Sequence, residues 1–141
     1  MPRAALLGSF VLAAGCASEP PAPPPAATFA NVQAVLSRAC NFSTCHGGSA
    51  MSGELRLVPG ESYAMLVNTP SSQVPRLLRV RPGDPSTSWL MNKLDNTLTA
   101  VPECRGGGNP CGVSMPERGA LLSATERDLF RRWIAAGAPG P

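Results

Sequence analysis

Residues 40–46, Cys-Asn-Phe-Ser-Thr-Cys-His, constrain this chain more than any other segment, because His46 is the only histidine among the 141 residues. Four residues separate Cys40 from Cys45, and the imidazole follows the second thiol directly. Two thiols followed at once by a histidine are typical of covalent haem attachment, although the usual spacing leaves two residues between the cysteines. Two other interpretations stay open. One is a Cys40–Cys45 disulfide beside a solvent-facing histidine, and the other is metal or thiol chemistry.

The N-terminus has the features of an export signal. Arg3 precedes an apolar run, residues 4–14, that is too short to span a bilayer as a helix. The run ends in Leu-Ala-Ala-Gly-Cys, which resembles a bacterial lipobox, although Ala13 stands where Leu, Val or Ile is usual. We therefore predict a signal peptide over residues 1–15 and a lipid on Cys16. The alternative is an ordinary secretory signal that is cleaved after a small residue.

A proline-rich linker follows the signal. Five of the six residues from 20 to 25 are proline, and such a chain is stiff and extended. We assign residues 16–27 to the lipidated cysteine and its linker, and residues 28–141 to one small domain. The net charge is +3, and no run of lysine or arginine exceeds two residues, so the sequence gives no support for nucleic-acid binding.

Hydrophobic periodicity predicts a mainly α domain. Apolar residues at helical spacing over residues 29–39 indicate a first helix, which Thr28 can cap. Residues 62–68 indicate a short helix, and a further helix is capped by Ser86 or Thr87 and runs through Trp89, Leu90, Lys93 and Leu94.

The last predicted helix has the clearest boundaries. Ser123 and Glu126 form a capping box at its start, and Gly137 ends it. Short strand signals over residues 53–58 and 77–80 allow a small β-hairpin insertion in the helical domain.

The remaining cysteines, Cys104 and Cys111, lie in the loop-rich residues 96–119. An exported protein rarely leaves thiols free, so each pair of cysteines needs a partner. We predict a Cys104–Cys111 disulfide that holds this loop in place. A zinc site built from these cysteines with Cys40, Cys45 and His46 is the less favoured alternative.

In this order, the residues resemble a class I cytochrome c and, more narrowly, the bacterial cytochrome c-like domains of exported proteins. The similarity covers nearly all of residues 29–138. Apart from the Cys/His segment, no single motif is specific for this family, but the motifs taken in order are more specific than any one of them. They are Cys45-His46-Gly47, Gly53-Glu-Leu-Arg-Leu57, Arg81-Pro-Gly-Asp-Pro-Ser86, Ser88-Trp-Leu90, Met115-Pro116 and Trp133-Ile-Ala-Ala-Gly137-Ala138.

The resemblance implies one covalent haem c. Cys40 and Cys45 would be the thioether attachment points, His46 the proximal ligand and Met115 the distal ligand of the iron. It also implies that the first and last helices cross, with Phe29 or Val32 near Phe130 or Trp133. Met115 alone would equally suit a core position, and Met51 and Met65 are weaker rival ligands.

The expected function is therefore that of a membrane-tethered periplasmic monohaem cytochrome that carries electrons to and from a redox partner protein. Its lipid would anchor it, by default, in the outer membrane. No acid–base pair, nucleophile elbow or phosphate loop indicates an enzyme.

The alternative is a haem-free, disulfide-clamped lipoprotein of the same fold with a structural or binding role. Haem requires His46 and Met115 to face each other across a flat cavity. The alternative fills that space with side chains and brings the Cys40 and Cys45 sulfurs within bonding distance.

Overall fold

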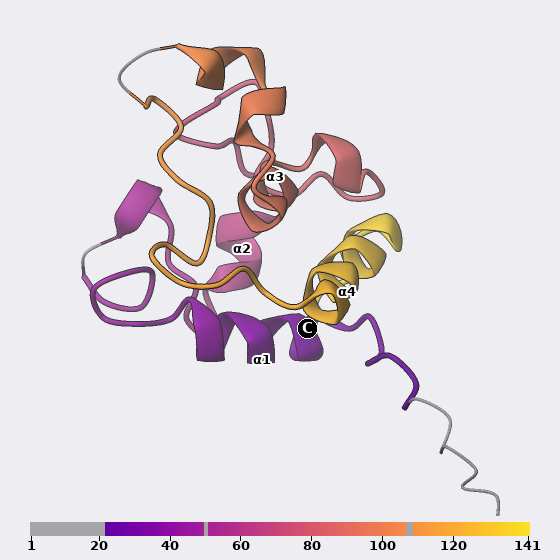
Figure 1. Ribbon diagram of the computed structural model, residues 1–141. Coiled ribbons are helices and arrows are strands. Elements are labelled where there is room, and N and C mark those ends of the chain that lie inside the picture. The colour runs from indigo at the N-terminus through magenta and orange to yellow at the C-terminus, as the bar shows by residue number, and fades with distance from the viewer. Residues whose placement is uncertain (1–21, 50, 107–108) are drawn as a thin grey trace, which may run out of the picture.

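The computed structural model describes residues 22–49, 51–106 and 109–141. Within them helices are the only regular elements, so the mainly α part of the prediction is confirmed. Four α-helices form the frame in Figure 1, namely α1 (Phe29–Ala39), α2 (Ser62–Leu66), α3 (Trp89–Asp95) and α4 (Ala124–Ala135). Short 3-10 helices lie in the connections, at η1 (Ser52–Glu54), η2 (Pro85–Thr87), η3 (Leu98–Ala100) and η4 (Pro102–Arg105).

The predicted β-hairpin is wrong for the described residues. Residues 53–58 begin within η1, and residues 77–80 contribute only to two isolated bridges, Val67 with Val80 and Pro70 with Leu78. The backbone groups that a hairpin would use are bound elsewhere. The Leu57 N–H donates to the His46 carbonyl at 2.8 Å, and the Gly53 carbonyl accepts from Arg79.

Helix α1 follows the sequence prediction at both ends. The Thr28 hydroxyl accepts a hydrogen bond from the Asn31 N–H at 3.3 Å, as an N-cap residue does. Cys40 is the C-cap, and its N–H donates to the Leu36 carbonyl. The buried face of the helix consists of Phe29, Val32, Val35 and Leu36. The helix therefore delivers Cys40 to the edge of the core.

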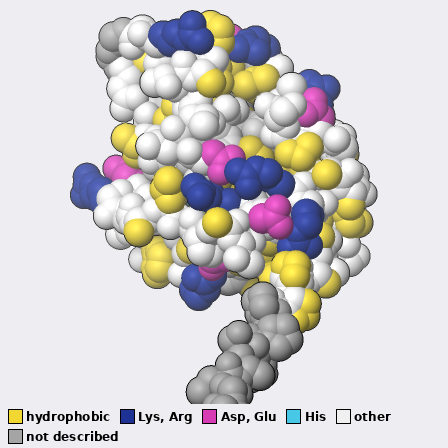
Figure 2. Space-filling view, turned by 45° about the vertical axis from the view of Figure 1, so that its right-hand side comes forward, with side chains coloured by type: hydrophobic (Ala, Val, Ile, Leu, Met, Phe, Trp, Pro, Cys, Tyr) yellow, Lys and Arg dark blue, Asp and Glu magenta, His cyan; other side chains and the backbone are white. Residues whose placement is uncertain are grey.

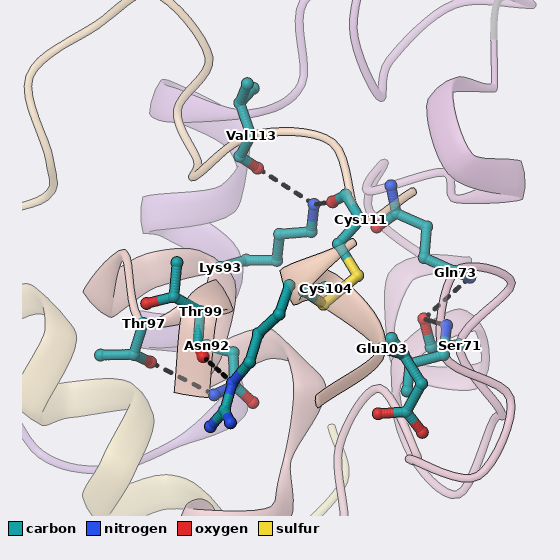
Figure 3. Close-up of a disulfide and its surroundings, with 12 residues drawn as sticks. Ser71, Gln73, Asn92, Lys93, Thr97, Thr99, Glu103, Cys104, Cys111 and Val113 are labelled. Atoms are coloured by element: carbon teal, nitrogen blue, oxygen red, sulfur yellow. Dashed lines mark hydrogen bonds between the residues drawn. A yellow bond between two sulfur atoms is a disulfide. The ribbon is translucent and has the colours of Figure 1, made fainter. Parts of the chain in front are cut away.

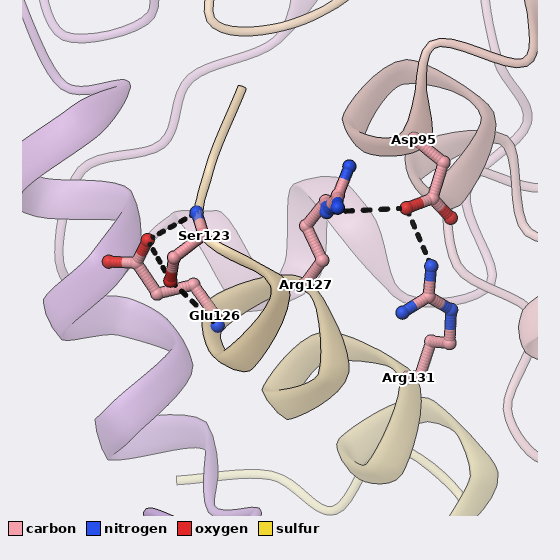
Figure 4. A network of polar contacts seen from close by, with 5 residues as sticks. All are labelled: Asp95, Ser123, Glu126, Arg127 and Arg131. Atoms are coloured by element: carbon pink, nitrogen blue, oxygen red, sulfur yellow. Dashed lines mark hydrogen bonds and ion pairs between the residues drawn. The ribbon is translucent and has the colours of Figure 1, made fainter. Parts of the chain in front are cut away.

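Helix α4 is held at its start by the predicted capping box. The Ser123 side chain accepts from the Glu126 N–H, and the Glu126 carboxylate accepts from the Ser123 N–H (Figure 4). After the helix Gly137 has φ +92°, a value that favours glycine and ends the helix. The buried stripe consists of Leu129, Phe130, Trp133 and Ile134, as predicted.

The first and last helices pack against each other, as the resemblance implied. The ring centroids of Phe29 and Trp133 lie 5.6 Å apart, and Tyr63 from α2 meets Phe29 edge-on at 5.1 Å. The Trp133 indole N–H donates to the Pro139 carbonyl, so its polar atom is satisfied inside the core. Burying each such side chain contributes about 1.5–3 kcal/mol, which makes this crossing a main source of stability.

Helix α3 begins later than predicted. Ser88 is its N-cap residue, and Asp84 instead accepts hydrogen bonds from the Ser86 and Thr87 N–H groups at the start of η2. The far end of α3 is tied to α4, because Asp95 lies 2.6 Å from Arg131 and 3.7 Å from Arg127 (Figure 4).

The buried side chains form two clusters. The larger one lies among α1, α3 and α4, and the smaller one contains Val74, Leu77, Trp89, Val101 and Cys111. On the face drawn in Figure 2, side chains of both charge signs are interspersed with apolar ones. Among the described residues no helix is both long and apolar enough to cross a membrane.

Candidate functional site

The segment after α1 folds into a compact loop that returns His46 to Cys40. The Cys45 and Gly47 N–H groups both donate to the Phe42 carbonyl, at 2.9 and 3.0 Å, and the His46 N–H donates to the Cys40 carbonyl at 3.3 Å. A Cβ atom on Gly47 would lie 2.6 Å from the Asn41 carbonyl oxygen. Glycine is therefore required where the loop closes on itself.

His46 is buried, with 8% of its surface exposed, and its ring is held by one hydrogen bond. The Nδ1 atom lies 3.0 Å from the Leu55 carbonyl oxygen. A carbonyl only accepts hydrogen bonds, so Nδ1 carries the proton, and the lone pair of the neutral ring is then on Nε2. Such a bond from the second ring nitrogen is how proteins orient a ligating histidine.

Both cysteines of this segment are free thiols, Cys40 buried and Cys45 half-buried. Burial raises the pKa of the Cys40 thiol from 9.0 to about 11, and the neighbouring Cys45 adds to this rise while Arg38 opposes it. Cys40 is thus a neutral thiol at neutral pH.

One cavity of about 320 Å³ collects three of the four predicted haem-site residues, because Cys40, His46 and Met115 all line it. These residues come from the end of α1, the loop after it and the segment before α4. Much of the remaining wall is apolar, with Leu36, Leu55, Leu57, Leu66, Leu90 and Leu94. Cys45 is not among the lining residues, although it adjoins His46 in the chain.

The described methionines differ in whether they lie at the cavity wall. Met115 is half-buried at the cavity wall, and its N–H donates to the Lys93 carbonyl at 2.9 Å. Met91 is 5% exposed in the larger core cluster, as predicted for a core residue. The rivals Met51 and Met65 do not line the cavity, so among the described methionines Met115 is the one found at its wall.

Two buried cations line the same cavity, and sequence analysis did not single out either as a site residue. The Arg79 guanidinium donates to the carbonyls of Met65, Gly53 and Glu54, at 2.9, 3.2 and 3.2 Å, and burial lowers its pKa. Lys93 donates to two carbonyls of the facing segment. Burial lowers the pKa of Lys93 to about 8, although Glu117 acts in the opposite direction.

A sequence signal for both cations existed. Arg79 stands between Leu78 and Val80, and Lys93 directly precedes Leu94 in a helix that also carries Trp89. A charged residue inside an apolar pattern that is otherwise buried needs a partner or a function.

The predicted Cys104–Cys111 disulfide is present, with Cα atoms 5.4 Å apart (Figure 3). Because these sulfurs are bonded to each other, they are not available as zinc ligands. Within residues 22–49, 51–106 and 109–141, no group of three or more His, Cys, Asp or Glu side chains is arranged to hold a metal ion. The zinc alternative therefore gains no support.

The signal peptide, the lipidation of Cys16 and the start of the linker lie outside the described residues. The described end of the linker contacts the domain. The Pro25 carbonyl accepts from Arg132 of α4 at 3.0 Å, and the Ala26 carbonyl accepts from Asn31 at 2.8 Å.

Comparisons of the chain with protein-family models, with curated proteins and with solved structures found no match. The function is therefore inferred from the site itself.

Proposed function

We propose that residues 28–141 form a cytochrome c-like domain that binds one covalent haem c and carries electrons. The observation that supports this most directly is the single cavity lined by Cys40, His46 and Met115. His46 and Met115 are 69 residues apart in sequence, and they are the two residues that the resemblance assigns as axial ligands.

The residues around the cavity fit the group. Cys40 and Cys45 are free thiols on a loop next to the histidine, and each could add its S–H across a vinyl group, with sulfur bonding one carbon and hydrogen the other. The imidazole of His46 and the thioether of Met115 are a known axial pair for haem iron. The leucine-rich wall suits the apolar face of a porphyrin.

Bound in this way, the haem would supply a one-electron ferric/ferrous couple. The chain's own residues would set its properties. The hydrogen bond from His46 Nδ1 to Leu55 fixes the ring orientation and increases the basicity of Nε2. The neutral thioether of Met115 and the apolar wall both favour the reduced state, because the oxidised centre carries the extra positive charge.

The setting of the domain is part of the same proposal. Lipid on Cys16 and the proline-rich linker would tether the domain to the periplasmic face of a membrane, by default the outer one. The carrier would exchange electrons with a redox partner protein and would make no bonds of its own.

The haem-free alternative requires a Cys40–Cys45 disulfide and side chains that fill the space between His46 and Met115. Here both thiols are free, and His46 and Met115 both line one cavity. These two observations favour the haem proposal over a haem-free domain that is clamped by two disulfides.

The test is to express the full chain together with cytochrome maturation genes, and to record a reduced-minus-oxidised visible spectrum and a denatured mass. We expect a sharp c-type band and a mass increase of one haem that survives denaturation. Cys40→Ala with Cys45→Ala should abolish the covalent mass, and Met115→Ala should keep the mass but alter the ligand field. Wild-type protein without the band, and with a mass lower by the hydrogens of two disulfides, would contradict the proposal.

A further inference from the structure

Lys93 binds the segment that carries Met115 from both its side chain and its backbone. Its Nζ atom donates to the Cys111 carbonyl and, at 3.0 Å, to the Val113 carbonyl (Figure 3). Its own backbone carbonyl accepts from the Met115 N–H at 2.9 Å. One residue of α3 therefore fixes alternate residues, 111, 113 and 115, of the facing segment.

This segment has little else to order it. Residues 109–123 contain no regular helix, and the Cys104–Cys111 disulfide restrains only their beginning. Val113 is 42% exposed, so its side chain contributes little packing. Beyond the disulfide, the contacts with Lys93 are the main hydrogen bonds that attach the backbone before Met115 to the helical frame.

The surroundings of Lys93 are those of a structural cation. The residue is 7% exposed and forms no ion pair with any described carboxylate within salt-bridge distance. Its charge is compensated by the two carbonyl dipoles, by the Trp89 ring, whose centroid lies 5.2 Å from Nζ, and by the more distant carboxylate of Glu117. A buried ammonium is unfavourable unless such partners are in place, and an apolar residue here would leave the carbonyls without their donor.

We propose that Lys93 is the positioning residue for Met115, because it holds residues 111–115 against α3 so that the thioether stays at the cavity wall. This inference rests on the proposed haem function. It adds that the distal ligand depends on a lysine that does not itself touch the iron.

The experiment compares three variants of the full chain with wild type. Lys93→Leu removes every donor and adds no thioether to the cavity, whereas Lys93→Gln keeps an N–H donor without the charge. Arg79→Leu is the matched control, because it removes the other buried cation of the cavity while leaving residues 111–115 untouched.

Three readouts separate the possible outcomes. Denatured mass reports haem attachment. The near-infrared thioether-to-ferric-iron absorption reports Met115 ligation. Hydrogen exchange of the Met115 amide in the haem-free chain reports the attachment of the segment without any haem.

Lys93→Leu should keep covalent haem but lose most of the thioether absorption. Its Met115 amide should exchange about 10-fold faster or more, as expected when charge-assisted hydrogen bonds are lost. Lys93→Gln should fall between wild type and Lys93→Leu, which keeps the test open if Lys93→Leu does not fold. Arg79→Leu should keep the thioether absorption.

Lys93→Leu with wild-type thioether absorption and wild-type amide exchange would overturn the inference. Equal loss of the absorption in Arg79→Leu would also overturn it, because the loss of either buried cation would then have the same effect. Wild-type protein without haem would instead overturn the proposed function. In that case unchanged exchange of the Met115 amide in Lys93→Leu would reject the role of Lys93 as well.

Discussion

Reducing the Cys104–Cys111 disulfide should lower the free energy of unfolding by about 2.5 kcal/mol. The two cysteines are 7 residues apart in sequence. Closing a loop of about 8 residues removes about 8 cal/mol/K of chain entropy from the unfolded state in the loop-closure treatment, or about 2.5 kcal/mol at 25 °C. The bond also fixes Cys111, which is buried in the smaller core cluster.

The assay is urea unfolding of a chain in which Cys16, Cys40 and Cys45 are alanine, so that only one cysteine pair can change its redox state. Oxidised and reduced samples then have the same side chains, and the comparison isolates loop closure from packing. With an m-value of about 1.5 kcal/mol per molar urea, the midpoint should fall by about 1.7 M on reduction.

Tryptophan fluorescence reports both clusters, because Trp89 lies in the smaller one and Trp133 in the larger one. Single-tryptophan variants, Trp89→Phe and Trp133→Phe, would follow each cluster by itself. Equal urea midpoints for the oxidised and reduced protein would refute the reasoning. Residues 104–111 would then be as restrained in the reduced unfolded chain as they are in the oxidised one. A fall confined to the Trp89 signal would show that the smaller cluster unfolds independently of the larger one.

Three further outcomes are expected. Gly47→Ala should lower the free energy of unfolding by about 1–3 kcal/mol, as overpacking does, because its Cβ would press on the Asn41 carbonyl; Gly106→Ala, which meets nothing within 4 Å, is the control in the same urea titration. Phe130→Ala should cost about 3–5 kcal/mol, because the ring is fully buried, and a loss below 1 kcal/mol would contradict this position in the core. Hydrogen bonds from Ser86 and Thr87 lower the pKa of Asp84 from 3.8 to about 2, so its contribution is complete above pH 3.8 and is lost as the pH falls through 2. Asp84→Asn should therefore be less stable than wild type at pH 5, and thermal melts should show the difference shrinking toward pH 2.

The helices were predictable because their signals are local. Thr28 and the Ser123 capping box mark helix starts through hydrogen bonds to residues three positions away, and the apolar stripe of α4 is a spacing within one helix. The crossing of α1 and α4 followed from the resemblance rather than from these signals. The Cys104–Cys111 disulfide followed from the number of cysteines and the short distance between them in the sequence.

The sequence could not reveal that residues 53–58 form no hairpin, because tertiary contacts decide their conformation. Leu55 and Leu57 alternate with charged residues as in a strand, yet their backbone serves the histidine loop. The Leu55 carbonyl accepts from His46 Nδ1, and the Leu57 N–H donates to the His46 carbonyl. A strand-like pattern of side chains cannot reveal that a segment 9 residues away will take its backbone groups.

The long spacing between Cys40 and Cys45 was the feature least consistent with the resemblance, and the structure shows where the additional residues lie. Phe42 is 53% exposed, and Ser43 and Thr44 are exposed as well, so the additional residues face solvent rather than the cavity. The hydrogen bond from His46 N–H to the Cys40 carbonyl brings the histidine back beside the first cysteine. The relation between thiol and imidazole is thus set by this backbone contact and by the Leu55 carbonyl, and not by the number of residues between the cysteines.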